Sequence, residues 1–365
     1  MLNILFWGTP AYAVPSLEAL LGAGHRIVGA VTQPDRRRGR GAALVPSAVK
    51  ARALELQIPV FTPERIRRDQ ATQAKLASLG ADLSVVVAFG QILPPEVLNQ
   101  PPLGCWNGHG SLLPRWRGAA PIQWSLIEGD SHTGVGIMAM EAGLDTGPVL
   151  LERPLTIGLL DNAHQLGDRL ASLTAELLAE ATVMIEAAGP GAEAQRLARL
   201  AVKPQASTGV TYARLLNKDD LQLDWSQPAL ALHRRVMGLY PGACSSWRGK
   251  RLKLLATEPL IQRLSAELSP EVRPLLEPWG TTPSDPSNQA SEPEPSRASP
   301  RAAAPGTVLG IAPQLGLIVA TGGCPLLIRE AQLEGKSPCE GARLLQQLAP
   351  QPGERLGDGP AQAVS

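Results

Sequence analysis

Short apolar segments alternate with stretches of helical periodicity through the first half of the chain. Leu2–Trp7, Arg26–Thr32 and Leu83–Ala88 have the composition of buried strands, and Val14–Leu21 has the pattern of a helix. This alternation predicts an α/β domain with a doubly wound, mostly parallel sheet and helices on both faces. The turn Gly8-Thr9-Pro10 lacks the Gly-x-Gly-x-x-Gly fingerprint, so the fold does not imply a dinucleotide cofactor.

Cap and turn signals place the elements between these strands. A serine is positioned to cap a helix over residues 48–56, and Pro63–Leu79 is predicted to be helical. Val135–Met140 and Pro148–Pro154 are predicted to pair as strands on either side of a turn. Leucines at near-helical spacing, beginning at Leu166, predict a long helix that closes the domain.

The length of 365 residues and changes in composition predict two domains. Glycine, proline and arginine are frequent just after the long helix, and Thr281–Ala304 has the Pro/Ser-rich composition of a disordered segment. The predicted parts are a catalytic domain over 1–188, a linker over 189–206, a second domain over 207–348 interrupted by an insertion at about 265–304, and a flexible tail over 349–365.

Composition also limits the partners and the compartment. The formal net charge is +1, so any surface that attracts nucleic acid must be local. The four cysteines are scattered without metal-binding spacing, which predicts a reducing compartment and no metal. No targeting segment or membrane-length apolar run is evident, so the sequence predicts a cytoplasmic enzyme without a membrane partner. Nothing in the sequence requires more than a monomer.

Polar side chains suited to acyl transfer follow one of the predicted strands. Asn107 and His109 lie two residues apart after Cys105-Trp106, so they share one face of a strand. Asp145 lies in the turn Gly-Leu-Asp-Thr-Gly. An amide can donate to a developing oxyanion, an imidazole can move a proton, and a carboxylate can orient the imidazole. Singly, each also fits a structural role, as a turn, surface or capping residue. No Ser or Cys nucleophile is recognisable, so attack by a group on the substrate is expected.

The residues around this set resemble a known family. The run Asn107-x-His109-x-Ser-Leu-Leu-Pro-x-x-Arg-Gly, followed by Gly-Leu-Asp-Thr-Gly, resembles the formyltransferases that use 10-formyltetrahydrofolate. The resemblance covers most of the chain and includes Phe6–Pro10, Thr32–Asp35, Val87–Pro94 and Lys218–Trp225. The family usually has an aliphatic residue where this chain has Gly108. We expect residue 108 to face away from the chemistry and Trp106 to fill the space.

The resemblance implies a fold, a reaction and a site. It implies a Rossmann-like formyltransferase domain followed by a partly open, OB-like β-barrel. It implies that the free α-amine of methionine on initiator tRNA takes the formyl group of 10-formyltetrahydrofolate, a co-substrate, through a tetrahedral intermediate, without a metal. Asn107 and His109 would stabilise the oxyanion, and Asp145 would hold His109 and relay the proton. The residues assigned to folate are Phe89, Gly90, Ile92, Leu93, Ser111, Leu112, Leu113 and Pro114.

Two basic segments are candidates for tRNA contact. From His233 to Leu254 there are six Lys or Arg and no Asp or Glu, and Trp247 lies among them. Clustered cations suit contact with an RNA backbone, although a solvated charged face is the alternative. By resemblance, the arginine-rich loop after Thr32–Asp35 lies against the tRNA acceptor end. The predicted tRNA-binding residues are Arg36, Arg37, Arg38, Arg40, Arg234, Arg235, Arg248, Lys250 and Arg251.

Three other functions compete with this interpretation. The same donor could formylate a small amine, a nucleotide sugar or glycinamide ribonucleotide. Water could attack the donor, which would make the enzyme a hydrolase. The chain could also be an RNA-binding module whose catalytic fold has degenerated. The basic second domain and the Arg40 loop disfavour a small acceptor, and the intact set of Asn107, His109 and Asp145 disfavours the non-enzyme.

Overall fold

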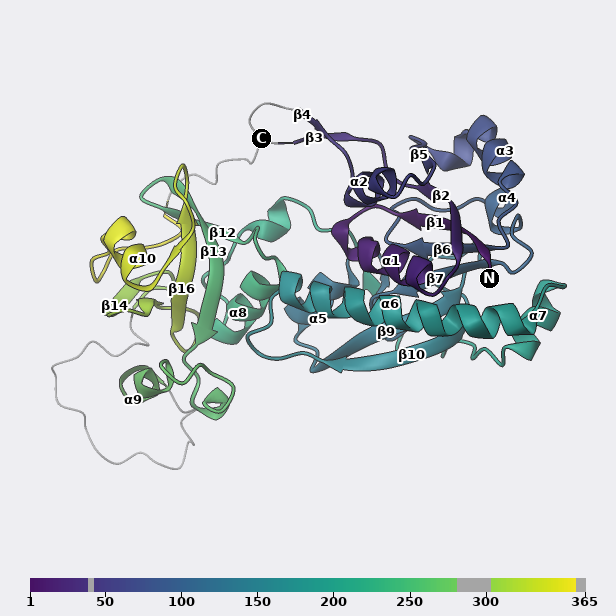
Figure 1. Cartoon of the computed structure of the whole chain (residues 1–365). Helices are drawn as coiled ribbons and strands as arrows, with labels where there is room; N and C mark the ends of the chain where they lie inside the picture. The colour runs from purple at the N-terminus through teal and green to yellow at the C-terminus, as the bar shows by residue number, and fades with distance from the viewer. Residues whose placement is uncertain (39–42, 281–302, 359–365) are drawn as a thin grey trace. The chain divides into compact units, whose positions relative to one another are not determined.

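A computed structural model describes residues 1–38, 43–280 and 303–358 (Figure 1). The chain folds into two compact units, which are described separately. The first comprises residues 1–122, 132–156 and 165–215, and the second comprises 123–131, 157–164 and the chain from 216 onward. No helix in the described ranges is long and apolar enough to cross a membrane.

A seven-stranded sheet is the centre of the first unit, within the residues that the structure describes. Its strands, in spatial order, are β10 (Val149–Thr156), β9 (His132–Ala139), β7 (Cys105–His109), β6 (Leu83–Val87), β1 (Asn3–Gly8), β2 (Arg26–Val31) and β5 (Val60–Phe61). Neighbours from β7 to β5 are parallel, whereas β9 runs antiparallel to β7 and to β10. The predicted doubly wound, mostly parallel sheet is confirmed.

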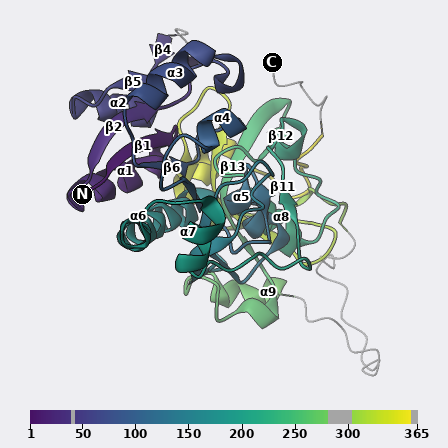
Figure 2. The same ribbon diagram turned by 90° about the vertical axis from the view of Figure 1, so that its right-hand side faces the viewer.

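Helices cover both faces of this sheet (Figure 2). The helices of the first unit are α1 (Val14–Gly22), α2 (Ala48–Glu55), α3 (Gln70–Ser78), α4 (Pro95–Leu98), α6 (Ala163–Ala188) and α7 (Glu193–Arg199), while α5 (Pro121–Glu128) passes into the second unit; short 3-10 turns occur at η1 (Ala11–Ala13) and η2 (Ile66–Arg68). Side chains along β1 and β6 point alternately to the two faces of the sheet. Leu5, Trp7 and Val86 point to one face, where they pack with residues of α3 and α4. Tyr12, beside α1, hydrogen-bonds Thr174 of α6 on the opposite face.

Local capping explains where two of these helices begin. The Ser47 side chain accepts a hydrogen bond from the Lys50 amide at 3.0 Å, as predicted for the helix over 48–56. The single helix predicted over Pro63–Leu79 is wrong. Asp69 interrupts it by accepting from the Thr72 amide at 3.0 Å, which makes Asp69 the N-cap of a new helix.

The predicted linker over 189–206 belongs to the first unit. It contains α7, whose Arg196 is only 8% exposed, and its Lys203 pairs with Val149 through two backbone hydrogen bonds of 2.8 Å. Beyond it, β11 (Tyr212–Ala213) pairs in parallel with β8 (Arg117–Gly118). The boundary therefore falls near 215, because packing against the sheet outweighs a composition typical of linkers.

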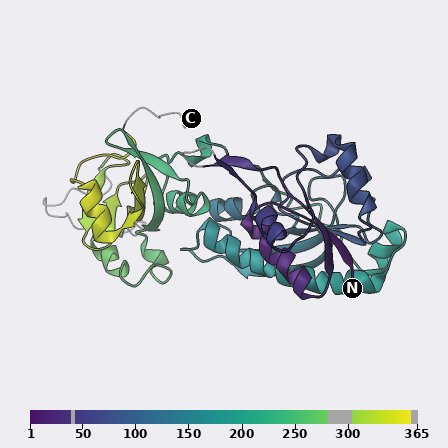
Figure 3. The same ribbon diagram turned by 45° about the horizontal axis from the view of Figure 1, so that its top comes forward.

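An antiparallel sheet forms the second unit (Figure 3). Its main path runs through β12 (Cys244–Trp247), β13 (Lys250–Pro259), β16 (Leu326–Leu333), β15 (Gly316–Val319) and β14 (Val308–Ala312), with β17 (Cys339–Glu340) paired to β16. Leu317 and Val319 pack with α8 (Ala229–Gly238) and α10 (Gly341–Leu348), whereas Ile318 faces a separate cluster. An antiparallel C-terminal domain is thus confirmed, and its closure into an OB-type barrel stays a prediction.

Two predicted boundaries in the second domain differ from the structure. The insertion was expected from about 265, but η4 (Gln262–Leu264), η5 (Arg273–Leu275) and α9 (Leu276–Trp279) are folded, and Leu268, Val272 and Leu276 pack against Ile318. The expected tail from 349 also joins this unit, because Leu356 is 1% exposed and bridges Trp247. These three leucine and valine side chains, although they lie in a proline-rich stretch, cover the face of the antiparallel sheet that carries Ile318. Residues 281–302 and 359–365 lie outside the described residues.

Candidate active site

Strand β7 carries Asn107 and His109 on the face that also bears Cys105. The Cys105 thiol donates to the Leu98 carbonyl of α4 at 3.5 Å, so this face looks toward α4. His109 is 6% exposed, and Asn107 is half-buried. The strand therefore brings an amide and an imidazole together near its carboxyl end, as the spacing predicted.

Gly108 faces α6, away from this pair. A Cβ on Gly108 would lie 2.5 Å from Thr174 Cγ2 and at ordinary contact distance, 3.6 Å, from Leu178 Cδ1. The expectation that Trp106 fills the space is wrong. Thr174 fills it, while the Trp106 indole donates to the Leu103 carbonyl at 3.0 Å. A glycine on β7 thus lets α6 approach the sheet closely.

Asp145 reaches this pair from the loop between β9 and β10. Asn107 Nδ2 donates to Asp145 Oδ1 at 3.4 Å, and His109 Nδ1 lies 3.7 Å from Asp145 Oδ2. The Gly118 amide donates to the same Oδ2 at 2.8 Å. The Asp145 side chain is 14% exposed, so the carboxylate is held within the site and remains accessible to a reactant.

The other ring nitrogen of His109 is fixed by a backbone carbonyl. Nε2 lies 2.9 Å from the Trp116 carbonyl oxygen, which can only accept, so Nε2 carries a hydrogen. The neutral ring would then turn an unprotonated Nδ1 toward the Asp145 carboxylate, whereas the imidazolium donates to it. Asn107 Nδ2 and His109 Nδ1 therefore both lie toward the Asp145 carboxylate, one on each of its oxygens.

The glycines of the Gly-Leu-Asp-Thr-Gly turn are required by close contacts. A Cβ at Gly147 would overlap the Ala139 carbonyl oxygen of β9, and a Cβ at Gly143 would overlap the Thr146 side chain. Asp145 itself has φ of 51°, in the left-handed region that Asp tolerates better than most residues. The turn therefore packs against the end of β9 and presents the carboxylate to β7.

Sequence reasoning missed Gln205, which lies in the predicted linker. Its Nε2 donates to the carbonyls of Asp145 at 2.8 Å and of Gly147 at 2.7 Å. Its Oε1 accepts from Arg117 Nε at 3.1 Å and Nη2 at 2.8 Å. No spacing rule connects Gln205 with a turn 60 residues earlier.

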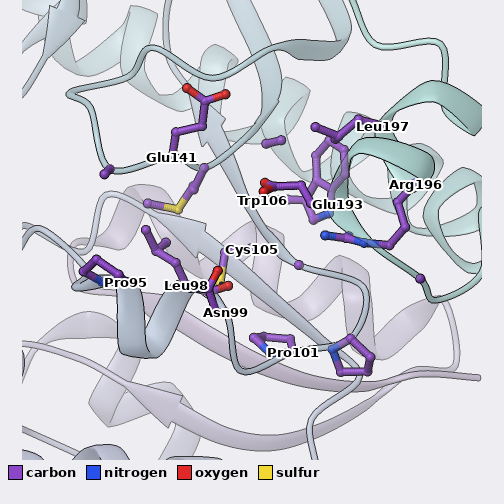
Figure 4. Close-up of a pocket in the computed structure, with 16 residues that line it drawn as sticks. Pro95, Leu98, Asn99, Pro101, Cys105, Trp106, Glu141, Glu193, Arg196 and Leu197 are labelled. Carbon is purple, nitrogen blue, oxygen red and sulfur yellow. The ribbon is translucent and has the colours of Figure 1, made fainter.

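A cavity of about 410 Å³ is lined in part by the start of β7 and by the loop that carries Asp145 (Figure 4). Cys105 and Trp106 of β7, Leu98 of α4, Met140 and Glu141 of the Asp145 loop, and Arg196 of α7 are among the residues that line it. Burial raises the pKa of the Cys105 thiol to about 12, so Cys105 is a neutral thiol there. The Arg196 guanidinium points into the cavity, and its Nε is buried without a hydrogen-bond partner in the described chain.

Two family descriptions match almost all of the chain. "Formyl transferase" matches residues 2–182, and "Formyl transferase, C-terminal domain" matches residues 215–349. The chain belongs to the formyl transferase family. It is an enzyme of one-carbon transfer, and the family's donor is a formyl-tetrahydrofolate.

Named relatives and a solved structure agree with this formyl transferase assignment. "Methionyl-tRNA formyltransferase" of Synechococcus sp. strain RCC307 is 64% identical over 350 residues, covering 95% of this chain and 100% of the relative. That of strain WH7803 is 62% identical, covering 98% of each chain. A crystal structure of WlaRD, "a sugar 3N-formyl transferase", matches with a TM-score of 0.55 at 14% identity, covering 92% of this chain and 99% of that one. At that identity the match shows the shared fold alone.

The eight residues predicted for folate in this formyl transferase do not form one surface. Phe89, Leu93 and Leu113 are at most 8% exposed and belong to the apolar core. Ser111 is also buried, and its hydroxyl donates to the Arg115 carbonyl at 2.6 Å. Gly90 and Ile92 are exposed, and Leu112 and Pro114 are half-buried. None of the eight is among the residues that line the cavity beside Asp145. The assignment of these eight residues to folate stays a prediction.

Three of the predicted tRNA-binding arginines of the first unit lie on a short strand. β3 (Arg36–Arg38) pairs with β4 (Ala43–Val45), and both Arg36 and Arg37 are exposed. The fourth, Arg40, lies outside the described residues.

The predicted cations of the second unit divide into two groups. Arg248, Lys250 and Arg251 are exposed around the turn between β12 and β13, although Arg248 also pairs with Glu354 at 2.8 Å. Arg235 is half-buried and donates to the Asp220 carbonyl at 2.6 Å, and half-buried Arg234 lies against Gly129. Trp247, which lies among these cations in the sequence, is 2% exposed, and its ring belongs to the core.

Proposed function

We propose that the protein transfers the formyl group of 10-formyltetrahydrofolate to the α-amine of methionine on initiator tRNA. The products would be N-formylmethionyl-tRNA, which starts translation in the cytoplasm, and tetrahydrofolate. The observation that carries the proposal is the meeting of Asn107, His109 and Asp145 at the end of β7. The names of the relatives at 62–64% identity support the choice of acceptor.

Asn107 and His109 are suited to stabilise charge. The donor supplies a formyl carbon whose oxygen gains negative charge as the amine adds. Asn107 Nδ2 is a donor beside that position, and a single such donor contributes about 2.7–4 kcal/mol to transition-state stabilisation. His109 Nδ1, which lies 3.7 Å from Asp145 Oδ2, is the second polar group beside that position.

Asp145 is suited to hold His109 and to receive the proton of the amine. An α-amino group has a pKa of about 7.7–8.0, so a useful fraction is neutral in the cell. After attack, the nitrogen must lose a proton, and the Asp145 carboxylate is an acceptor at the site that is 14% exposed. Proton transfer would proceed directly or through one water.

The cavity beside Asp145 fits the ring system of the donor. Its volume of about 410 Å³ lies in the range of small-molecule sites, about 300–1,000 Å³. It is lined by apolar side chains such as Leu98 and Met140 and by Arg196, whose Nε has no hydrogen-bond partner among the described residues. A carbonyl oxygen on a bound heterocycle would satisfy that donor. We therefore assign the cavity, rather than the eight predicted residues alone, to the donor.

Exposed cations are the candidates for contact with the tRNA backbone. Exposed Arg36 and Arg37 in the first unit, and exposed Arg248, Lys250 and Arg251 in the second, are in the proposed set. The set also keeps half-buried Arg234, and Arg38 and Arg40, whose side chains are not among those described. Contacts of this kind to phosphates position a nucleic acid and weaken with salt. Arg235 is removed from the set because its guanidinium is used within the second unit.

The proposal is tested by comparing acceptors. Purified protein is mixed with 10-formyltetrahydrofolate and either methionyl-initiator tRNA, free methionine, or no acceptor, and formyl-methionine and free formate are measured. The proposal expects formylation only of the charged tRNA. Formylation of free amines at a comparable kcat/KM would indicate a small-acceptor enzyme, and formate release without acceptor would indicate a hydrolase.

A further inference from the structure

Gln205 joins the two loops that meet at the Asp145 carboxylate. Its amide group donates to the carbonyls of Asp145 and Gly147 and accepts twice from the Arg117 guanidinium. All four distances lie between 2.7 and 3.1 Å. One half-buried side chain therefore binds the backbone of the turn on one side and the loop after β7 on the other.

These loops determine where the carboxylate lies. The residue after Arg117, Gly118, donates its amide to Asp145 Oδ2 at 2.8 Å, the same oxygen that faces His109. A movement of either loop would change the separation of Asp145 from Asn107 and His109. Because misplacement by about 1 Å can lower a rate by about a hundredfold, the loops must be held firmly.

The backbone at Asp145 needs outside support. Its φ of 51° is uncommon for a residue other than glycine, and such a conformation persists where neighbouring structure fixes it. Gln205 bonds to the carbonyl of this residue and to that of Gly147. Gln205 is itself placed by the pairing of Lys203 with Val149 at the start of β10.

We propose that Gln205 is the positioning residue for Asp145, acting through the backbone of the turn. The proposal rests on the proposed function of Asp145 and goes beyond it. Gln205 reaches Asp145 only through its carbonyl oxygen, and no hydrogen bond or ion pair of its side chain to Asn107 or His109 is found among the described residues. Its Nε2 donors hold the turn, and its Oε1 ties the turn to Arg117.

Two substitutions separate these two halves of the amide. Gln205→Met keeps the length of the side chain and removes every hydrogen bond. Gln205→Glu keeps an acceptor for Arg117 but cannot donate to the carbonyls of Asp145 and Gly147. We expect kcat for formylation of methionyl-tRNA to fall about ten- to a hundredfold in both variants. The KM for each substrate and the affinity for 10-formyltetrahydrofolate, measured calorimetrically, should stay within about threefold of wild type.

A matched control is Gln73→Met. Gln73 is a buried glutamine of α3 whose Nε2 donates to the Ile66 carbonyl at 2.7 Å, and the Asp145 carboxylate and its partners do not contact it. It should lower the melting temperature and leave kcat unchanged.

Three results would overturn the role of Gln205. Wild-type kcat in Gln205→Glu would mean that the residue only tethers Arg117. Wild-type kcat in Gln205→Met would remove any positioning role. If both KM values rise and the melting temperature falls while kcat per folded molecule stays normal, Gln205 is merely structural. If wild-type protein itself fails to formylate methionyl-tRNA, the proposed function fails instead, so the two failures are distinguishable.

Discussion

Replacing Gly108 by alanine should destabilise the first unit through a single contact. A Cβ at this position would lie 2.5 Å from Thr174 Cγ2, whereas ordinary contacts begin at 3.4 Å, so the strand and α6 must separate by nearly 1 Å. Overpacking of a buried site costs about 1–3 kcal/mol, and the smaller unfolded-state entropy of alanine offsets about 0.4–1 kcal/mol. The middle of each range gives a net loss of about 1.3 kcal/mol, which corresponds to a melting temperature lower by about 3–5 °C for a unit of this size.

A second substitution makes this reasoning refutable. Thr174→Ser removes the methyl group that clashes but keeps the hydroxyl, which bonds Tyr12 at 2.8 Å and the Leu170 carbonyl at 2.7 Å. We expect Gly108→Ala and Thr174→Ser each to lower the melting temperature measured by scanning calorimetry, and the double variant to recover most of the loss. Coupled neighbours typically show about 0.5–3 kcal/mol of interaction. Additive losses, or full stability in Gly108→Ala alone, would show that Thr174 does not fill the space beside Gly108.

Three further predictions concern the donor cavity, the tRNA surface and the second unit. Arg196→Met should raise the KM for 10-formyltetrahydrofolate about tenfold or more, because a hydrogen bond to a charged group contributes about 1.5–3 kcal/mol. The KM for tRNA should not change, and steady-state kinetics with each substrate varied would check both values. Lys250→Glu and Arg251→Glu should raise the KM for tRNA and reduce the slope of its salt dependence by about one per phosphate contact. A KM for tRNA equal to that of wild type at both low and moderate salt would remove these residues from the tRNA surface. Burial lowers the pKa of His233 below its ordinary 6.5, so the unfolded chain takes up the proton first as the pH falls, and stability present above pH 6.5 is lost below it. The free energy of unfolding in urea should therefore fall between pH 7.5 and 5.5, and His233→Gln should make this dependence on pH weaker.

The periodicity of strands predicted the central part of the site. Asn107 and His109 two residues apart could only share a face once Cys105–His109 formed a strand, and the structure has β7 over those residues. The pairing of β9 with β10 around Asp145 was also predictable, because apolar segments flank a glycine-rich turn. These are local signals, and they do not depend on which elements pack together.

Contacts between distant segments could not be predicted in the same way. Gln205 and Thr174 act on Asp145 and Gly108, which precede them by 60 and 66 positions, and composition alone described the stretch after 188 as a linker. Trp247 lies next to cations in the sequence, yet in strand β12 its side chain falls on the core face. Packing decided each of these cases, and a single sequence carries little information about packing.

The most direct test of the account is Asp145→Asn, assayed for both donor binding and formyl transfer. The substitution keeps the shape of the side chain and removes the charge that faces His109 Nδ1 at 3.7 Å. Single-turnover formylation of methionyl-initiator tRNA should be lost, while calorimetric binding of 10-formyltetrahydrofolate stays within about threefold of wild type and the melting temperature changes little. Formylation at close to the wild-type rate in Asp145→Asn would contradict the central claim that Asn107, His109 and Asp145 together carry the reaction.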